Sequence, residues 1–419
     1  VKNVIKIKKS KMSLKISPFA PKKVHEFSTI LGINVSSTNC GLKKNNKADL
    51  VLIKFEYPSK IISFFTNSKT PGAPVIWNKS ISKYSKVSAI LVNSGNANVF
   101  TGKHGVMSVK KIVEDLAKKL KVPKEEIYIA STGVIGEKLD FKKILNKIPF
   151  LIKNLKNDQL SWRNAADAIR TTDTYSKIES LKPNKRNHFI LNGIAKGSGM
   201  IFPNMATMLA FIFTDFEIKS LFKKKISEII NKTFNSITVD GDTSTSDMVL
   251  LVSVKNEISK KRVLTKKVRD DFFNALEKIS QKLSHLIVKD GEGLSKFISI
   301  NVLGAKNYQN AKKVAFSIGN SQLFKTSLSG SELNWGRIIM AIGKANVKIN
   351  PEKISIKFGK YLILKNGEYI SKNKTHLKKY MKSKNIELIV DLGVSNGKAK
   401  IWTCDLTKEY IKINTNYLT

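Results

Sequence analysis

The amino-acid sequence predicts an α/β fold, and two periodic patterns carry that prediction. Short apolar runs rich in β-branched residues alternate along the chain with segments whose apolar residues recur every three or four positions. The chain has 419 residues, enough for one large core or two fused lobes, and it contains no internal repeat. We therefore expect strands packed in layers with amphipathic helices.

Two segments have the spacing of amphipathic helices. In the first, apolar residues form one stripe and lysines lie on the opposite face. The second has a similar stripe, so we expect a helix in each place. The stripes are Val109, Ile112, Val113, Leu116 and Leu120 in the first segment, and Phe272, Leu276, Ile279 and Leu283 in the second.

Six apolar runs are expected strands. Most of them are apolar on both faces, which is typical of strands buried between two layers. The runs are residues 50–53, 87–92, 127–130, 208–213, 248–254 and 297–302.

The chain is strongly basic, with a formal net charge of +42. Such a charge normally suggests nucleic acid or an anionic membrane as a partner. Here the lysines are spread almost evenly, often on the polar side of amphipathic stretches, so we interpret them as a solvated surface. Attraction of acidic substrates is the alternative. A basic RNA-binding protein would need a known module or a surface of aromatic and basic residues, and we find neither.

Two cysteines, Cys40 and Cys404, cannot build a disulfide framework, and no Cys/His grouping suits a metal. Residues 1–23 are basic but lack the apolar centre of a secretory signal, and no run has the length of a membrane-spanning helix. We expect a cytoplasmic protein without a metal site or membrane partner; an organellar presequence is the alternative.

Six polar segments rich in small residues are expected directly at the ends of the predicted strands, where active-site loops are commonly built. Each segment alone is compatible with an ordinary turn. The segments are NSGNAN (93–98), STGVIG (131–136), KGSGM (196–200), TVDGDTST (238–245), KDGEG (289–293) and NWGR (334–337).

Taken together and in this order, the segments resemble the ornithine acetyltransferase family. The stretch IAKGSGMIFPNMATMLAFIFTD (194–215), TTDT (171–174) and the tail from DLGVSNG (391–397) complete the resemblance. It implies that the protein cuts its own Ala206–Thr207 bond. The products would be an α chain of residues 1–206 and a β chain of residues 207–419, which stay together and pair as α2β2. The implied fold is a layered α/β sandwich of two interleaved lobes, like that of self-processed aminopeptidases.

Threonine is a poor nucleophile unless a base removes its hydroxyl proton. Cleavage before Thr207 would supply that base, because a free α-amino group ordinarily has a pKa of about 7.7–8.0 and is partly neutral at pH 7. The resemblance also implies an oxyanion hole made by Thr132 and the backbone of Gly133.

The implied reaction moves an acetyl group from N-acetylornithine to glutamate through Thr207, with no cofactor. Acetyl-CoA as a second acetyl donor stays open, and so does a self-processed amidase or aminopeptidase that uses water instead of glutamate. The chain departs from the family pattern at 99–101, at Phe202, at Ser246 and at 332–333, which leaves fine specificity open. The implied substrate contacts are Thr172 or Thr174, Lys196, Thr207, Glu292, Asn414 and Thr419.

Overall fold

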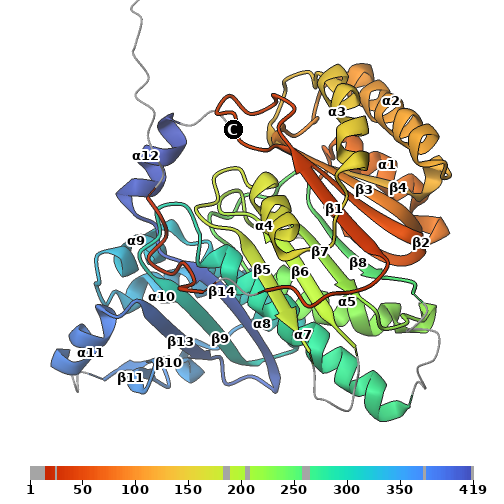
Figure 1. The fold of residues 1–419 in the computed structure, drawn as a ribbon. Coiled ribbons are helices and arrows are strands. Elements are labelled where there is room, and N and C mark those ends of the chain that lie inside the picture. Colours follow the sequence, from red (N-terminus) through yellow and green to blue (C-terminus); the bar gives the residue numbers. More distant parts are fainter. Residues whose placement is uncertain are drawn as a thin grey trace, which may run out of the picture.

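The computed structural model describes residues 15–23, 26–182, 189–202, 208–256, 265–370 and 374–416. These residues form two β-sheets with helices packed on them (Figure 1). The α/β fold predicted from the sequence is confirmed.

The larger sheet contains eight strands within the described residues, in the order β4-β3-β2-β8-β7-β6-β5, with β1 paired to β2. The pairs β3–β4 and β7–β8 are parallel, and the other pairs are antiparallel. The strands are β1 (Ile33–Thr38), β2 (Leu50–Phe65), β3 (Lys86–Asn96), β4 (Ile127–Val134), β5 (Lys177–Leu181), β6 (Leu191–Lys196), β7 (Leu209–Thr214) and β8 (Met248–Ser253).

Strand β2 joins two halves of this sheet that pack face to face. Residues 50–54 pair with β3 and residues 60–65 pair with β8, and between them the register with β3 shifts. Side chains from both halves share one buried core, in which the ring centroids of Phe55 and Phe213 are 6.2 Å apart. The prediction stopped at residue 53, because the polar stretch that follows hides the continuation of the strand.

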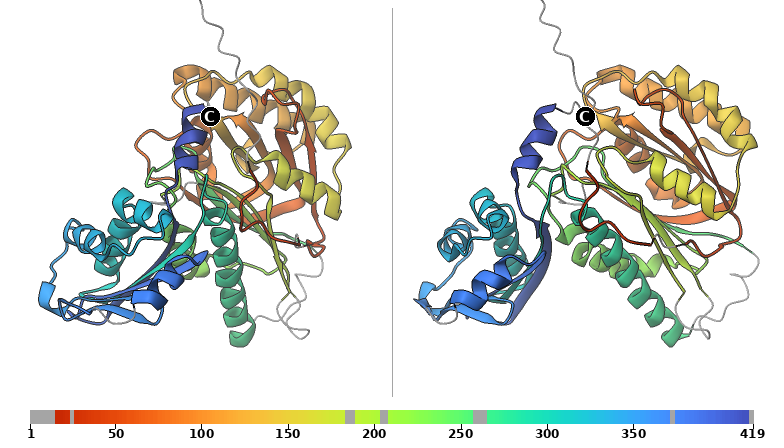
Figure 2. Two further views of the ribbon diagram at one scale, coloured as in Figure 1. Left: turned by 90° about the vertical axis from the view of Figure 1, so that its left-hand side faces the viewer. Right: turned by 60° about the vertical axis from the view of Figure 1, so that its left-hand side comes forward.

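Helices cover the outer faces of both halves (Figure 2). Alternate side chains of β2, β3 and β4 point away from the shared core and pack on α1, α2 and α3, and those of β6, β7 and β8 pack on α5 and α7. These strands are therefore buried on both faces, as predicted, in a helix–strand–strand–helix sandwich. Both predicted helices are present, as α2 and α7.

The helices of the described residues are short except for these two. Their bounds are α1 (Ala73–Ile81), α2 (Gly102–Leu120), α3 (Phe141–Lys153), α4 (Gln159–Ala168), α5 (Lys223–Lys232), α7 (Lys266–Val288), α8 (Tyr308–Gly319), α9 (Gln322–Ser329), α10 (Trp335–Gly343), α11 (Lys374–Met381) and α12 (Lys408–Asn416), with the 3₁₀ turns η1 (Ser82–Tyr84), η2 (Lys124–Glu126), η3 (Ser220–Phe222), η4 (Phe234–Ser236) and η5 (Pro351–Lys353).

The second sheet has the order β12-β11-β10-β13-β9-β14 and carries its own core with α8 to α11. Most of the predicted strands were expected to be buried on both faces, and β9 is an exception, because its buried residues alternate with half-buried ones. The polar residues Ser299 and Asn301 are among the half-buried ones. The strands are β9 (Phe297–Ala305), β10 (Ser355–Phe358), β11 (Tyr361–Lys365), β12 (Glu368–Tyr369), β13 (Asn385–Asp391) and β14 (Gly397–Cys404).

The predicted boundary between residues 206 and 207 falls inside the larger sheet. Strands β7 and β8 follow the boundary in sequence, yet they lie between β2 and β6, which precede it. Two chains divided there would share one hydrogen-bonded sheet. The division itself stays a prediction.

The two cysteines are buried and unpaired. Among the helices that the structure describes, none is both long and apolar enough to cross a membrane.

Acid stability should depend on His285 of α7. Burial, with the nearby charges of Lys289 and Lys400, lowers the pKa of His285 to about 4. The unfolded chain then takes up the proton first, so folding stability falls as the pH drops from about 6.5 towards 4, by up to about 3 kcal/mol. In urea unfolding at several pH values, His285→Phe should remove this part of the pH dependence, and exposed His376→Gln should not. Equal pH dependence in His285→Phe and wild type would contradict the assignment.

Candidate active site

The site is assembled where Lys196 ends β6. Its ammonium Nζ lies 3.1 Å from Thr132 Oγ1 at the end of β4 and 2.8 Å from Thr171 Oγ1. Strands β4 and β6 belong to opposite layers of the sandwich, so Lys196 spans the two layers at their ends. Three segments predicted as functional meet at this one side chain.

The contact with Lys196 also bears on the direction of the hydrogen bonds that the Thr132 hydroxyl forms. When Lys196 carries its proton, it only donates hydrogen bonds, so Thr132 Oγ1 accepts from it and keeps its own proton for another acceptor. Such a hydroxyl is suited to stabilise a developing oxyanion.

Gly133 follows Thr132 and lies against the end of β3. Its φ is 131°, and a Cβ at this position would come within 2.4 Å of the Gly95 backbone carbon. Only glycine fits here. Next to it, Ser131 Oγ donates to Asn93 Oδ1 at 2.6 Å, so the two predicted loops are tied together.

Glu292 lies on the other side of the site and connects to α12. Its carboxylate accepts from Asn414 Nδ2 at 2.8 Å, and its backbone N–H donates to Ser198 O at 3.0 Å. Burial raises the pKa of Glu292, although hydrogen bonds from Thr172 and Asn414 oppose this. Two residues far apart in the sequence, both predicted as substrate contacts, are thus neighbours.

The threonines of the TTDT segment have different surroundings. Thr172 Oγ1 lies 2.6 Å from Ser198 Oγ and near Glu292. Thr174 donates to the Asp290 carboxylate through both its hydroxyl and its backbone N–H, so its hydroxyl proton is used inside the protein. The sequence left the choice between them open, and it passed over Thr171, which contacts Lys196.

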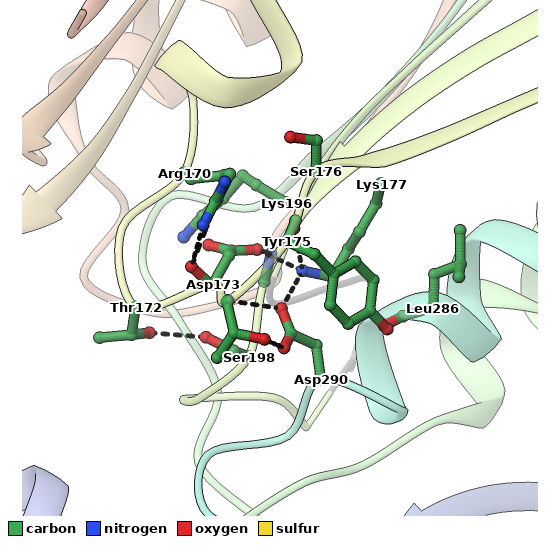
Figure 3. A network of polar contacts seen from close by, with 12 residues as sticks. Arg170, Thr172, Asp173, Tyr175, Ser176, Lys177, Lys196, Ser198, Leu286 and Asp290 are labelled. Atoms are coloured by element: carbon green, nitrogen blue, oxygen red, sulfur yellow. Dashed lines mark hydrogen bonds and ion pairs between the residues drawn. The ribbon is translucent and has the colours of Figure 1, made fainter. Parts of the chain in front are cut away.

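A buried ion network lies beneath these residues (Figure 3). Lys177 Nζ, at the start of β5, is 2.6 Å from Asp173 Oδ1 and 2.6 Å from Asp290 Oδ2, and all three side chains are fully buried. Burial alone would lower the pKa of Lys177, but the two carboxylates raise it. Burial would raise the pKa of Asp173, but the charges of Lys177 and Lys196 hold it low. Sequence analysis missed this network, although both aspartates stand in motifs that it singled out.

The TVDGDTST segment holds the chain ahead of the predicted cleavage point. Asp240 accepts from Met200 N at 2.6 Å and Ile201 N at 2.9 Å, and Thr243 Oγ1 donates to Phe202 O at 2.9 Å. Tyr410 of α12 donates to Asp240 at 3.3 Å. This segment therefore connects α12 to the strand-end loops.

The NWGR segment is a helix cap. Asn334 Oδ1 accepts from Arg337 N at 3.3 Å at the start of α10, and Arg337 reaches Leu323 O in α9 at 2.6 Å. The expectation that it is a strand-end loop is wrong, because it connects two helices of the second sheet's core.

Three predicted residues, Ala206, Thr207 and Thr419, lie outside the described residues. The description resumes at Met208, whose carbonyl accepts from Met248 N at 3.0 Å. The next residue, Leu209, is the cross-strand partner of Lys196.

Hydroxyl, ammonium and carboxylate groups gather at the strand ends of this layered α/β sandwich, and such groups are suited to an enzyme site for a small polar substrate. The family model described as the ArgJ family matches residues 34–419. The chain therefore belongs to the ArgJ family. This confirms the resemblance inferred from the motifs and the prediction of an acetyl-transferring enzyme of arginine biosynthesis, a glutamate N-acetyltransferase.

Individual relatives match the chain over nearly its whole length. Proteins called arginine biosynthesis bifunctional protein ArgJ from Bartonella henselae and Brucella suis are each 40% identical to the chain, over 97% of it and 100% of their own length. Among solved structures, an ArgJ from Bacillus halodurans is 39% identical, with a TM-score of 0.47, over 50% of this chain and 100% of that one. An ornithine acetyltransferase from Mycobacterium tuberculosis, complexed with ornithine, is 29% identical, with a TM-score of 0.40, over 42% of this chain and 93% of that one.

Removing the central cation of the buried network should destabilise the fold. Lys177→Met leaves Asp173 and Asp290 buried without their counter-charge, which should cost about 3–5 kcal/mol of unfolding free energy. Urea denaturation at neutral pH measures it. The matched control is Lys225→Met, because the Lys225–Glu228 pair is half exposed and 3.6 Å apart. It should change stability by less than about 1 kcal/mol. A similar small change in Lys177→Met would contradict the structural role of the network.

Proposed function

We propose that this chain transfers the acetyl group of N-acetylornithine to glutamate through an acetyl ester on Thr207, after cutting itself before that residue. The observation that carries the proposal is the contact of Lys196 with Thr132. This contact places the Thr132 hydroxyl at the end of β6. Lys196, the last residue of β6, is the cross-strand partner of Leu209, which follows Thr207 by two residues. Family membership and the PNMATML stretch support it independently.

Self-cleavage would begin with attack of Thr207 Oγ on the carbonyl carbon of Ala206. The peptide nitrogen leaves as the α-amine of Thr207, and water hydrolyses the resulting ester to the carboxylate of Ala206 and the free hydroxyl. The larger sheet supports this proposal, because β7 and β8 lie between β2 and β6. This pairing would keep residues 1–206 and 207–419 together after cleavage. Pairing of two such units as α2β2 belongs to the same proposal.

Acetyl transfer then proceeds in two steps. Thr207 Oγ attacks the acetyl carbonyl, its proton goes to the α-amine, and the Thr132 hydroxyl with the Gly133 N–H donates to the oxyanion. Ornithine leaves with a proton, and the amine of glutamate attacks the ester in the same way. Lys196, Glu292 and Asn414 would hold the charged groups of both amino acids.

Neither step needs a cofactor. The relatives are called bifunctional, which supports a second activity. We propose that this activity is glutamate acetylation with acetyl-CoA as the donor.

The central experiment combines processing and turnover. Wild-type protein should run as two fragments, the second beginning at Thr207, and Thr207→Ala should remain one chain. With N-acetylornithine alone, the 207–419 fragment should gain one acetyl group in mass spectrometry. With glutamate added, ornithine and N-acetylglutamate should form with parallel double-reciprocal plots. Ornithine release at the same rate without glutamate, and no N-acetylglutamate, would identify an amidase instead.

The oxyanion role of Thr132 predicts a kinetic effect. Thr132→Ala should lower kcat by about 10²-fold, the loss typical when one such donor is removed. Thr132→Ser keeps the hydroxyl and is the matched control; it should retain most of the activity. An unchanged kcat in Thr132→Ala would exclude the hydroxyl from the mechanism.

A further inference from the structure

We propose that Asp173 is the positioning residue for Lys196, fixing the place of its ammonium group and keeping that group charged inside the protein. The inference rests on the proposed function, in which Lys196 holds a carboxylate of the substrates. The inference identifies Asp173 as the residue through which the buried network of Lys177, Asp173 and Asp290 affects the site.

The Asp173 carboxylate fixes the position of Lys196 through two neighbouring residues, Gly197 and Thr171. Oδ1 accepts from the N–H of Gly197, the residue after Lys196, at 2.6 Å. Oδ2 accepts from the N–H of Thr171 at 3.0 Å, and the hydroxyl of Thr171 in turn accepts from Lys196 Nζ at 2.8 Å. One carboxylate therefore fixes both the backbone that carries the ammonium and the hydroxyl that receives it.

The segment that carries Asp173 is itself fixed. Arg170 Nη2 donates to the Asp173 carbonyl oxygen at 2.8 Å, and Lys177 Nζ of β5 donates to the Asp173 carboxylate at 2.6 Å. The Asp173 side chain is fully buried, so it cannot exchange these partners for water. Its position is thus determined before a substrate enters.

The charges around Lys196 make Asp173 the strongest influence on its protonation after burial. Burial lowers the pKa of Lys196, and the carboxylates of Asp173, Glu292 and Asp247 raise it, Asp173 most. Lys177 opposes them, and Lys43 is a further cation nearby. Loss of the Asp173 charge should therefore let Lys196 lose its proton at lower pH.

Asp290 provides a matched comparison, because it shares Lys177 with Asp173 but has a different second partner. Its carboxylate accepts from the backbone and hydroxyl of Thr174. The contacts of Gly197 and Thr171 described above go to Asp173. A purely structural role of the network would make the two aspartates equivalent, whereas the positioning role makes them different.

The test compares Asp173→Asn with Asp290→Asn in the processed enzyme. For each we would measure kcat/KM for glutamate across the pH range, together with thermal unfolding. In Asp173→Asn the basic limb of the profile should move to lower pH by roughly 1 unit, and KM should rise more than kcat falls. In Asp290→Asn the basic limb of the kcat/KM profile should stay at the same pH as in the wild type, although the melting temperature falls. An unmoved limb in Asp173→Asn, or equal shifts in both variants, would overturn the inference.

Lys196→Met separates this inference from the proposed function. It should abolish the basic limb and raise KM for glutamate; unchanged kinetics would refute the substrate role of Lys196 itself. If Asp173→Asn does not fold, Thr171→Val and Thr171→Ser replace it, since they remove and keep the hydroxyl that receives Lys196. We expect kcat/KM to fall roughly 10-fold or more in the valine variant, with rescue by serine. Equal activity of the two would overturn the positioning path.

Discussion

The constraint on which this molecule depends is the apolar core between the two halves of the larger sheet. Phe55, Phe213 and Leu250 belong to that core, and they hold the layers face to face. Because the layers are stacked, the ends of β4 and β6 come within the reach of one lysine side chain, although four strands separate them in the sheet order. Without this packing there would be strand ends but no site between them.

The same arrangement explains how a chain could be cut without coming apart. Strands β7 and β8 lie between β2 and β6, which precede residue 206, so separating residues 1–206 from 207–419 would break two ladders and expose the two apolar cores that they share. Burial of apolar area is the main stabilising contribution to folding. Loss of one peptide bond between β6 and β7 leaves all of that burial in place.

The sequence predicted the parts of the molecule whose information is local. Periodicity identified α2, α7 and the buried strands, and the order of the motifs identified the family. It did not identify the link between Lys177 and Asp290, because those residues are 113 positions apart and only the folded sheet brings them together. The course of β2 past residue 53 and the one-sided burial of β9 were missed for a related reason, since tertiary packing decides both.

Charge in this protein acts at two separate scales. Surface lysines produce the net charge of +42, but at physiological ionic strength exposed charges are screened beyond about 8 Å. Inside the site, burial pushes Lys196 and Glu292 towards their neutral forms, and only neighbours within a few ångströms oppose it. Asp173 does this for Lys196, and it can do so because Lys177 in turn keeps Asp173 ionised. The excess positive charge on the surface affects how anionic substrates approach. The buried residues Lys177, Asp173 and Lys196 determine the charge that those substrates meet in the site.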